Sequence, residues 1–137
     1  VKAVQIGGPL GGLVPVSKIK DLTVDFESFS KNGFLLGHAS VVSVPEDYPI
    51  MKFIEHLFDF AAYESCGKCF PCRLGTKRGQ ELAEKALTSE YKIDKKLFTD
   101  LLTTLEQGSL CAHGGGIPLP VRNALQYFDD ELRPYFN

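Results

Sequence analysis

A chain of 137 residues, 44% of them hydrophobic, can bury one ordinary core or two small ones, as is typical of a globular protein. The 15 Lys and Arg against 17 Asp and Glu give a net charge of −2, which argues against the broad positive surface of a nucleic-acid-binding protein. No apolar run approaches the roughly 20 residues that cross a bilayer. We therefore expect no nucleic-acid partner, no direct membrane insertion, and a location in the cytoplasm or at the cytoplasmic face of a membrane complex.

The first part of the chain predicts a small sheet of short strands. Residues 1–6 alternate between apolar and polar side chains, as a half-buried strand does. The glycines around Pro9, in residues 7–12, indicate a tight turn or the wall of a small ligand site. Residues 22–26 and 41–44 are further strand candidates, and we expect a mixed sheet.

From residue 50 the hydrophobic period changes from two to nearly four, which predicts helices. The first apolar stripe runs from Ile50 to Ala61 and leads into a cysteine-rich segment, and His56 lies off this stripe, where we expect it to be solvated. A second helix should follow the cysteines, with its apolar face at residues 79–86. Arg73, Lys77 and Arg78 stand early in that helix, where positive charge is unfavourable unless an anion lies nearby. A cluster with four thiolates is such an anion. A basic surface turn explains Lys77 and Arg78 equally well.

Two more helices are expected. Asp94 can cap the third, which ends near Gly108 and has its buried face at Leu97, Phe98, Leu101, Leu102 and Leu105. Residues 109–116 read as a loop, and Pro118 and Pro120 suit the start of a fourth helix with apolar positions up to Leu132. The sequence therefore predicts an α+β fold, with a small sheet followed by an up-and-down four-helix bundle.

The cysteine pattern favours an iron-sulfur cluster. Cys66, Cys69 and Cys72 stand at intervals of three, and Cys111 lies far along the chain. A 4Fe–4S cubane needs four thiolates from tetrahedrally spread directions; a curled loop can supply three, and the fourth must come from elsewhere. Gly67 allows such a loop to bend tightly. Cys111 can return to the other three cysteines only if the helices run antiparallel.

Other roles for the cysteines stay open. A structural zinc site also takes four cysteines, but it usually presents two separate C-x2-C pairs, whereas three of the four cysteines stand in one run in this sequence. Disulfides need an oxidising compartment, and the three neighbouring cysteines are too close in sequence to pair comfortably. His113 is a weaker candidate for a ligand or a neighbouring contact, and we expect His38 to be structural or at the surface.

The segment Glu64-Ser65-Cys66-Gly67-x-Cys69-x-Pro71-Cys72-Arg73-x-Gly75 resembles the cluster-binding segment of a known family. This family comprises the NADH-binding, flavin-carrying subunit of respiratory complex I and its relatives in NAD-linked hydrogenases and formate dehydrogenases. Residues 7–12 resemble the glycine-rich turn of the soluble-ligand-binding β domain that precedes the cluster domain in the same family. Residues 36–40 depart from the usual Gly-Ser-Gly-Gly stretch, so the likeness is closer to a side branch.

The resemblance implies a β-grasp-like, soluble-ligand-binding unit at residues 1–49 and a helical cluster domain at residues 50–137. It implies a 4Fe–4S cluster whose ligands are Cys66, Cys69, Cys72 and Cys111. The resemblance also implies FMN and NAD(H) for the full-length protein, in an upstream domain of the same polypeptide. This chain itself has neither a G-x-G-x-x-G helix start nor a Walker-type loop.

These inferences predict an electron-transfer module of an NAD(P)H:acceptor oxidoreductase of the diaphorase type. Single electrons would pass between the FMN and the iron-sulfur centres of a partner subunit. Because the chain begins at Val1 and its one methionine is Met51, we expect a fragment of an NADH dehydrogenase, hydrogenase or formate dehydrogenase subunit that is not catalytic alone. The alternative is a zinc- or cluster-stabilised docking or redox-sensing module without electron flux.

Overall fold

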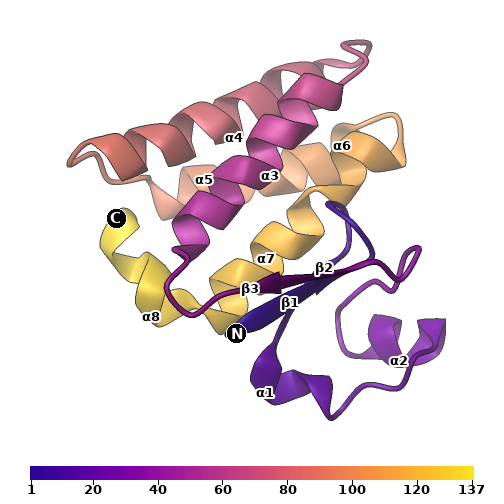
Figure 1. Cartoon of the computed structure of the whole chain (residues 1–137). Helices are drawn as coiled ribbons and strands as arrows, with labels where there is room; N and C mark the ends of the chain where they lie inside the picture. Colours follow the sequence, from indigo (N-terminus) through magenta and orange to yellow (C-terminus); the bar gives the residue numbers. More distant parts are fainter.

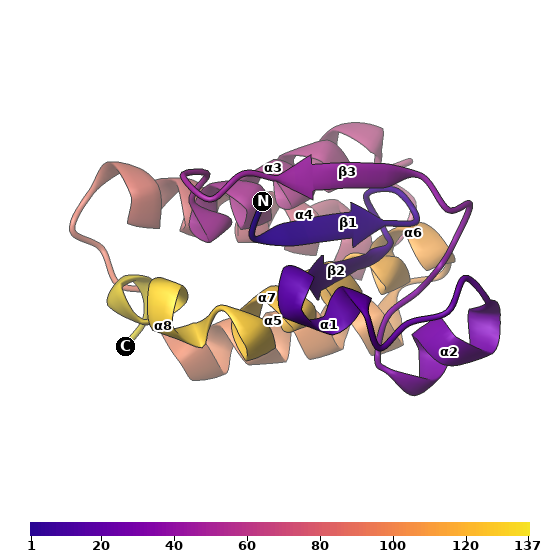
Figure 2. The same ribbon diagram turned by 60° about the horizontal axis from the view of Figure 1, so that its bottom comes forward.

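The computed structural model describes all 137 residues and shows a small sheet with most of the helices packed to one side of it (Figure 1). The strands are β1 (Ala3–Ile6), β2 (Gly12–Pro15) and β3 (Val41–Val44). Their order is β2-β1-β3, and both outer strands run antiparallel to β1 (Figure 2). The α+β class is thus confirmed, whereas the expected mixed sheet is wrong, because no strand pair is parallel.

The glycine-rich stretch between β1 and β2 is the tight turn that the sequence predicts. Gly7 and Gly8 have φ angles of 96° and 84°, which residues with a side chain rarely adopt. A Cβ at Gly7 would also lie 2.7 Å from the carbonyl oxygen of Leu36, so the neighbouring loop leaves no room for one. The turn therefore holds the loop that leads to β3 close against the sheet.

The segment between β2 and β3 forms helices where a strand was expected. It contains α1 (Val16–Ile19) and α2 (Phe26–Lys31), and the prediction of a strand at residues 22–26 is wrong. The Asp25 carboxylate accepts a hydrogen bond from the Ser28 N–H at 2.6 Å and so caps α2. Hydrogen bonds from the Thr23 hydroxyl and from Ser28 lower the pKa of Asp25. The capped helix is therefore more stable here than the strand that the residue types of the segment predicted.

The remaining helices are α3 (Ile50–Glu64), α4 (Phe70–Thr88), α5 (Lys95–Gly108), α6 (Ala112–Gly116), α7 (Pro118–Tyr127) and α8 (Asp129–Leu132), followed by a 3₁₀ turn at Arg133–Tyr135. The first three predicted helices are confirmed as α3, α4 and α5, and Asp94 caps α5 by accepting the Leu97 N–H at 2.9 Å.

Three details of the helical part were predicted wrongly. Residues 112–116 form α6 and not a loop, and the fourth helix is interrupted at Phe128 between α7 and α8. Leu97, expected on the buried face of α5, is 50% exposed. The description of these helices as an up-and-down bundle that holds a cluster stays a prediction.

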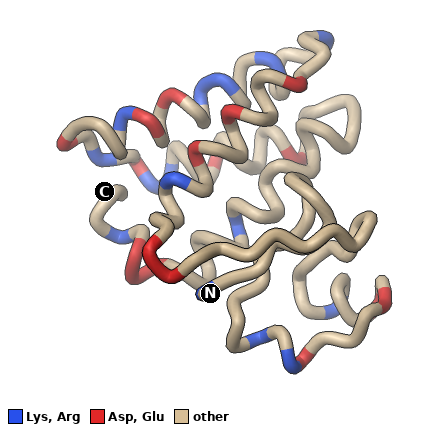
Figure 3. The backbone as a smooth tube through the Cα atoms, in the orientation of Figure 1, with Lys and Arg blue, Asp and Glu red and all other residues tan.

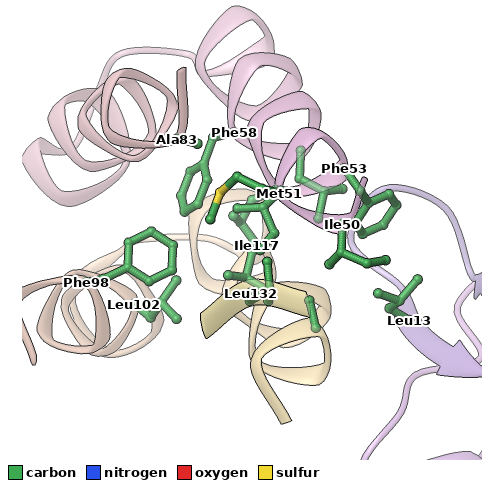
Figure 4. Close-up of a cluster of buried hydrophobic side chains, with 14 of the residues drawn as sticks. Leu13, Ile50, Met51, Phe53, Phe58, Ala83, Phe98, Leu102, Ile117 and Leu132 are labelled. Atoms are coloured by element: carbon green, nitrogen blue, oxygen red, sulfur yellow. The ribbon is translucent and has the colours of Figure 1, made fainter. Parts of the chain in front are cut away.

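One hydrophobic core joins the sheet to the helices. It contains 21 buried residues, and side chains from β2, α3, α4, α5 and α8 converge in its centre (Figure 4). Ala3, Leu13 and Val44 from the strands belong to the same cluster as Phe58 and Phe98 from the helices. The core therefore contains residues from both sides of residue 49. The division into units at 1–49 and 50–137 stays a prediction. A second, smaller cluster contains Val14, Phe29, Phe34 and Leu36.

Glu131 of α8 connects both ends of the chain to α3. The Lys2 ammonium group donates hydrogen bonds to its two oxygens at 3.0 and 2.8 Å, and the Ile50 N–H donates to one of them at 2.7 Å. Pro49, which precedes α3, provides no capping side chain. The Glu131 carboxylate therefore binds a free N–H group at the positive end of α3, where negative charge is favourable.

Charged side chains of both signs are interspersed along α3 and α4, whereas the three strands carry none (Figure 3). His56 is exposed, as the sequence predicts. None of the helices has the combined length and hydrophobicity that spanning a membrane would require.

Candidate cluster site

The first three cysteines lie where α3 ends and α4 begins. Residue 65 leaves the helical conformation, and Gly67 bends the loop with a φ of 73°. Cys69 is the N-cap residue of α4, and Cys72 is buried in its first turn. The loop therefore presents three thiols next to the free N–H groups of a helix N-terminus, where negative charge is stabilised.

Arg73 holds this loop closed. Its guanidinium group donates a hydrogen bond to the Gly67 carbonyl oxygen at 3.3 Å and lies over the Phe70 ring, 4.9 Å from the ring centre. The two other basic residues of this region bind elsewhere, since Lys77 donates to Gln80 at 3.1 Å and Arg78 pairs with Glu81 at 3.6 Å. Arg73 therefore shapes the loop, whereas Lys77 and Arg78 belong to the surface of α4.

Cys111 reaches the same hollow from the turn between α5 and α6. It is the N-cap residue of α6, and the backbone N–H of Leu110 is the main group that lowers the pKa of the Cys69 thiol, followed by the N–H of Cys72. His113, the second residue of α6, forms a hydrogen bond at 2.9 Å between its Nε2 atom and the Ala61 carbonyl oxygen of α3. These contacts fix α6, and with it Cys111, against the cysteine loop.

Glycines allow this close packing. A Cβ on Gly114 of α6 would lie 2.8 Å from the Cβ of Cys72, and one on Gly75 of α4 would lie 3.0 Å from the Leu105 side chain. Both distances are shorter than ordinary carbon–carbon contact. Gly114 therefore lets α6 lie directly against Cys72, and Gly75 lets α4 approach α5.

All four cysteines line one hollow of about 480 Å³. They differ in exposure, because Cys66 and Cys111 are exposed, Cys69 is partly buried and Cys72 is buried. The other lining residues are Phe60, Glu64, Ser65, Lys68, Leu110 and His113. No three histidine, cysteine, aspartate or glutamate side chains are grouped closely enough to hold a single metal ion. The thiols thus surround a space and do not converge on one point.

The two remaining histidines lie outside the cysteine hollow. His38 and His56 line a second hollow of about 430 Å³, beside β3 and α3.

Ser65 was not predicted as part of the site, although its hydroxyl lies 3.3 Å from the Cys72 sulfur. The available signal was its place directly before Cys66. Phe60 and Leu110 were not predicted either, since no spacing rule marks an apolar side chain as the wall of a site.

The fold and the hollow define a class of protein: a small α+β unit with four cysteines gathered at the ends of its helices. A family model described as the NADH-ubiquinone oxidoreductase-F iron-sulfur binding region matches residues 52–135. The chain belongs to this family, as the cysteine segment predicted. The family assignment also supports the 4Fe–4S cofactor expected from the cysteines.

Individual relatives agree with the family assignment. The chain is 31% identical over 135 residues to the NADP-reducing hydrogenase subunit HndC of Solidesulfovibrio fructosivorans, covering 98% of this chain and 27% of that protein. It is 30% identical over 133 residues to the mitochondrial 51 kDa subunit of NADH-ubiquinone oxidoreductase from Aspergillus niger, covering 95% of this chain and 26% of that one. The relatives are oxidoreductase subunits, and the chain spans about a quarter of their length.

A solved structure has the same fold. A chain in the crystal structure of an NAD⁺-reducing [NiFe]-hydrogenase in the H₂-reduced state superposes with a TM-score of 0.85 at 26% sequence identity. The match covers 99% of this chain and 23% of the hydrogenase chain. The sheet and the helices therefore occur together in that larger protein.

Proposed function

We propose that this chain is the electron-transfer module of an NAD(P)H:acceptor oxidoreductase, and that Cys66, Cys69, Cys72 and Cys111 hold its 4Fe–4S cluster. Single electrons pass between an FMN in an upstream domain of the same polypeptide and the iron-sulfur centres of a partner subunit. The observation that carries this proposal is the single hollow lined by cysteines from two distant segments of the chain. The relatives, named as NADP-reducing hydrogenase and NADH-ubiquinone oxidoreductase subunits, support the link to a nicotinamide.

The residues around the hollow suit a negatively charged group held by thiolates. When bound, a 4Fe–4S cluster with four cysteine ligands exchanges one electron at a time and leaves no iron position open to a substrate. The backbone N–H groups of Leu110 and Cys72 face the Cys69 sulfur and offset its charge, and Lys68 adds a positive charge at the hollow. Phe60 and Leu110 provide apolar side chains at the wall of the hollow.

The hollow that the four cysteines line and the run of three cysteines in the sequence favour a cluster over zinc. One zinc ion binds sulfur at about 2.3 Å, so its four sulfurs must lie within about 4 Å of one another. The four cysteines of this chain surround a hollow of about 480 Å³, which is more space than one zinc ion occupies. A cubane of four irons and four sulfides is larger than one ion and needs its ligands further apart.

Exposed apolar side chains near the cysteines support docking of a partner subunit. Phe70 and Leu74 at the start of α4 are 68% and 60% exposed, and Leu110 beside Cys111 is 76% exposed. Tyr63, in the last turn of α3, is 86% exposed. Large exposed apolar groups that gather at one place commonly mark a protein interface. A partner that covers them would bring its own redox centre close to the cluster.

Metal analysis tests this proposal directly. Anaerobically purified protein should contain iron and sulfide in equal amounts, about four of each per chain, and should give an electron paramagnetic resonance signal after reduction by dithionite. Equimolar zinc without iron or sulfide would overturn the proposal in favour of a zinc-stabilised docking module. Easy and reversible loss of the metal, with no electron flux to any acceptor, would support a redox sensor.

Activity measurements provide a second test. The chain should show no sustained oxidation of NADH, because the nicotinamide and flavin sites are proposed to lie in another domain. Electrons supplied by a chemical reductant should nevertheless enter the chain and leave it to an added one-electron acceptor. Robust flavin-dependent turnover of NADH by these 137 residues would contradict this division of roles.

A further inference from the structure

The half-buried Ser65 lies next to the sulfur of a cysteine other than its sequence neighbour. Its hydroxyl oxygen is 3.3 Å from the Sγ atom of Cys72, seven residues further along the chain. Among the side-chain hydrogen bonds of the protein, this is the one that reaches a cysteine sulfur. The end of α3 places the serine there, since residue 65 is the first residue beyond this helix.

The ionisation state of a ligating cysteine determines the direction of this hydrogen bond. The Ser65 oxygen also accepts a hydrogen bond from the Gly67 N–H at 3.2 Å, which leaves its own proton free to be donated. A serine hydroxyl has one proton to donate, and a metal-bound thiolate has none. The Ser65 proton is therefore available to the Cys72 sulfur, which can only accept it.

We propose that Ser65 is a positioning residue whose hydroxyl group donates a hydrogen bond to the Cys72 sulfur and thereby raises the reduction potential of the cluster. This inference rests on the proposed role of Cys72 as a ligand. Reduction adds one electron and neither forms nor breaks a bond, so the hydroxyl keeps its proton throughout. A hydrogen bond to a ligand sulfur stabilises the more negative, reduced state more than the oxidised state.

The position of Ser65 allows the effect to be measured separately from the fold. The Cys69 sulfur faces backbone N–H groups, which the substitution of a side chain does not remove. The loop around Ser65 is also held by the hydrogen bond from Arg73 to Gly67. Removal of the hydroxyl takes away the hydrogen bond to the Cys72 sulfur and also the acceptor of the Gly67 N–H, so the iron content of Ser65→Ala reports whether the loop keeps its shape.

The test compares reduction potentials in the 137-residue chain with its cluster in place. Wild type, Ser65→Ala, Ser65→Thr and Ser109→Ala are purified anaerobically, their iron and sulfide are counted, and the midpoint potential is measured by redox titration followed by electron paramagnetic resonance. Ser65→Thr keeps the hydroxyl. Ser109 is the matched control. It packs beside Gly114, as Cys72 does, but its buried hydroxyl has no hydrogen-bond partner.

We expect wild-type iron content in all four proteins and a lower midpoint potential in Ser65→Ala alone. An unchanged potential in Ser65→Ala would overturn the inference, and so would an equal shift in Ser65→Thr or Ser109→Ala. Loss of iron from Ser65→Ala would overturn it as well, because the hydroxyl would then hold the loop and not tune the potential. Absence of iron from the wild-type chain would instead contradict the proposed function.

Discussion

At the scale of single residues, Asn123 shows how one polar side chain joins the sheet to the helices. It is 4% exposed on α7. Its side-chain oxygen accepts a hydrogen bond from the Leu13 N–H of the outer strand β2 at 3.0 Å, and its side-chain nitrogen donates to the Gly33 carbonyl oxygen at 3.1 Å. Buried backbone groups need such partners, because an unpaired group loses its hydrogen bonds to water without replacement.

Replacement of Asn123 by leucine should destabilise the protein. The substitution leaves the Leu13 N–H and the Gly33 carbonyl without a partner, and the expected loss is about 2 kcal/mol or more in the free energy of unfolding. Urea denaturation measures it. Gln126→Leu, on the exposed side of the same helix, is the control and should change the stability little. Equal stability of Asn123→Leu and wild type would show that these hydrogen bonds contribute nothing.

Replacement of Cys111 tests whether this cysteine is the fourth ligand of the cluster. Cys111→Ala should lower the iron and sulfide content well below that of wild type and should abolish or change the spectrum of the reduced protein, because the cubane loses its fourth ligand. Removal of the other exposed cysteine, in Cys66→Ala, should have the same effect. Full iron content with an unchanged spectrum in Cys111→Ala would exclude this cysteine as a ligand.

At the scale of elements, the contact between α3 and α4 determines where the cysteine loop lies. Gly79 of α4 sits under the ring of Phe58 of α3, and an added Cβ would lie 2.7 Å from the Cζ atom of that ring. Phe58 is fully buried and also packs edge to face against Phe98 of α5, with 6.0 Å between the ring centres. The ring therefore has no free space into which it can withdraw.

Gly79→Ala should be destabilising although alanine favours helices more than glycine does. Overpacking of a filled core costs about 1–3 kcal/mol, whereas the gain in helix propensity is about 1 kcal/mol. Thermal or urea unfolding should thus show a net loss. In Gly115→Ala of α6 the new Cβ would meet only the Glu106 carbonyl oxygen at 3.7 Å, so this control keeps the gain in helix propensity and should not be destabilised. A gain in stability for Gly79→Ala would mean that Phe58 can move aside.

At the scale of the whole molecule, the hollow joins two turns that are distant in the sequence. Cys66 and Cys69 lie between α3 and α4, Cys72 lies in the first turn of α4, and Cys111 lies between α5 and α6. A cluster bound by all four would link these turns, and the same helices enclose the main core at their other faces. Binding that occurs only in the folded state stabilises that state.

Removal of the cluster should therefore lower the thermal midpoint of the whole protein. We expect a decrease of several degrees after anaerobic treatment with a chelator, since about 1 kcal/mol corresponds to roughly 4 °C for a domain of this size. Calorimetry of the loaded and the stripped chain measures the difference. Chelator treatment should hardly affect Cys111→Ala, which is expected to hold little cluster. Identical midpoints for the loaded and the stripped wild-type chain would show that the cluster adds nothing to the stability of the fold.

The sequence by itself was sufficient to predict the features that depend on neighbours in the chain. The apolar stripes predicted α3, α4 and α5, Asp94 marked the start of α5, and the spacing of the cysteines indicated a cluster. Each of these signals lies within a few residues, where helical periodicity and capping act directly. The family likeness rested on the same kind of local pattern.

Only the tertiary structure decided the features that depend on distant groups. The helix α6 is rich in glycine and has little helix propensity of its own, but it forms against Cys72 and is joined to α3 through His113. Glu131 caps a helix 81 residues away, and Leu110 brings its N–H group to Cys69. No local pattern contains these pairings, because they exist only once the core has packed the helices against one another.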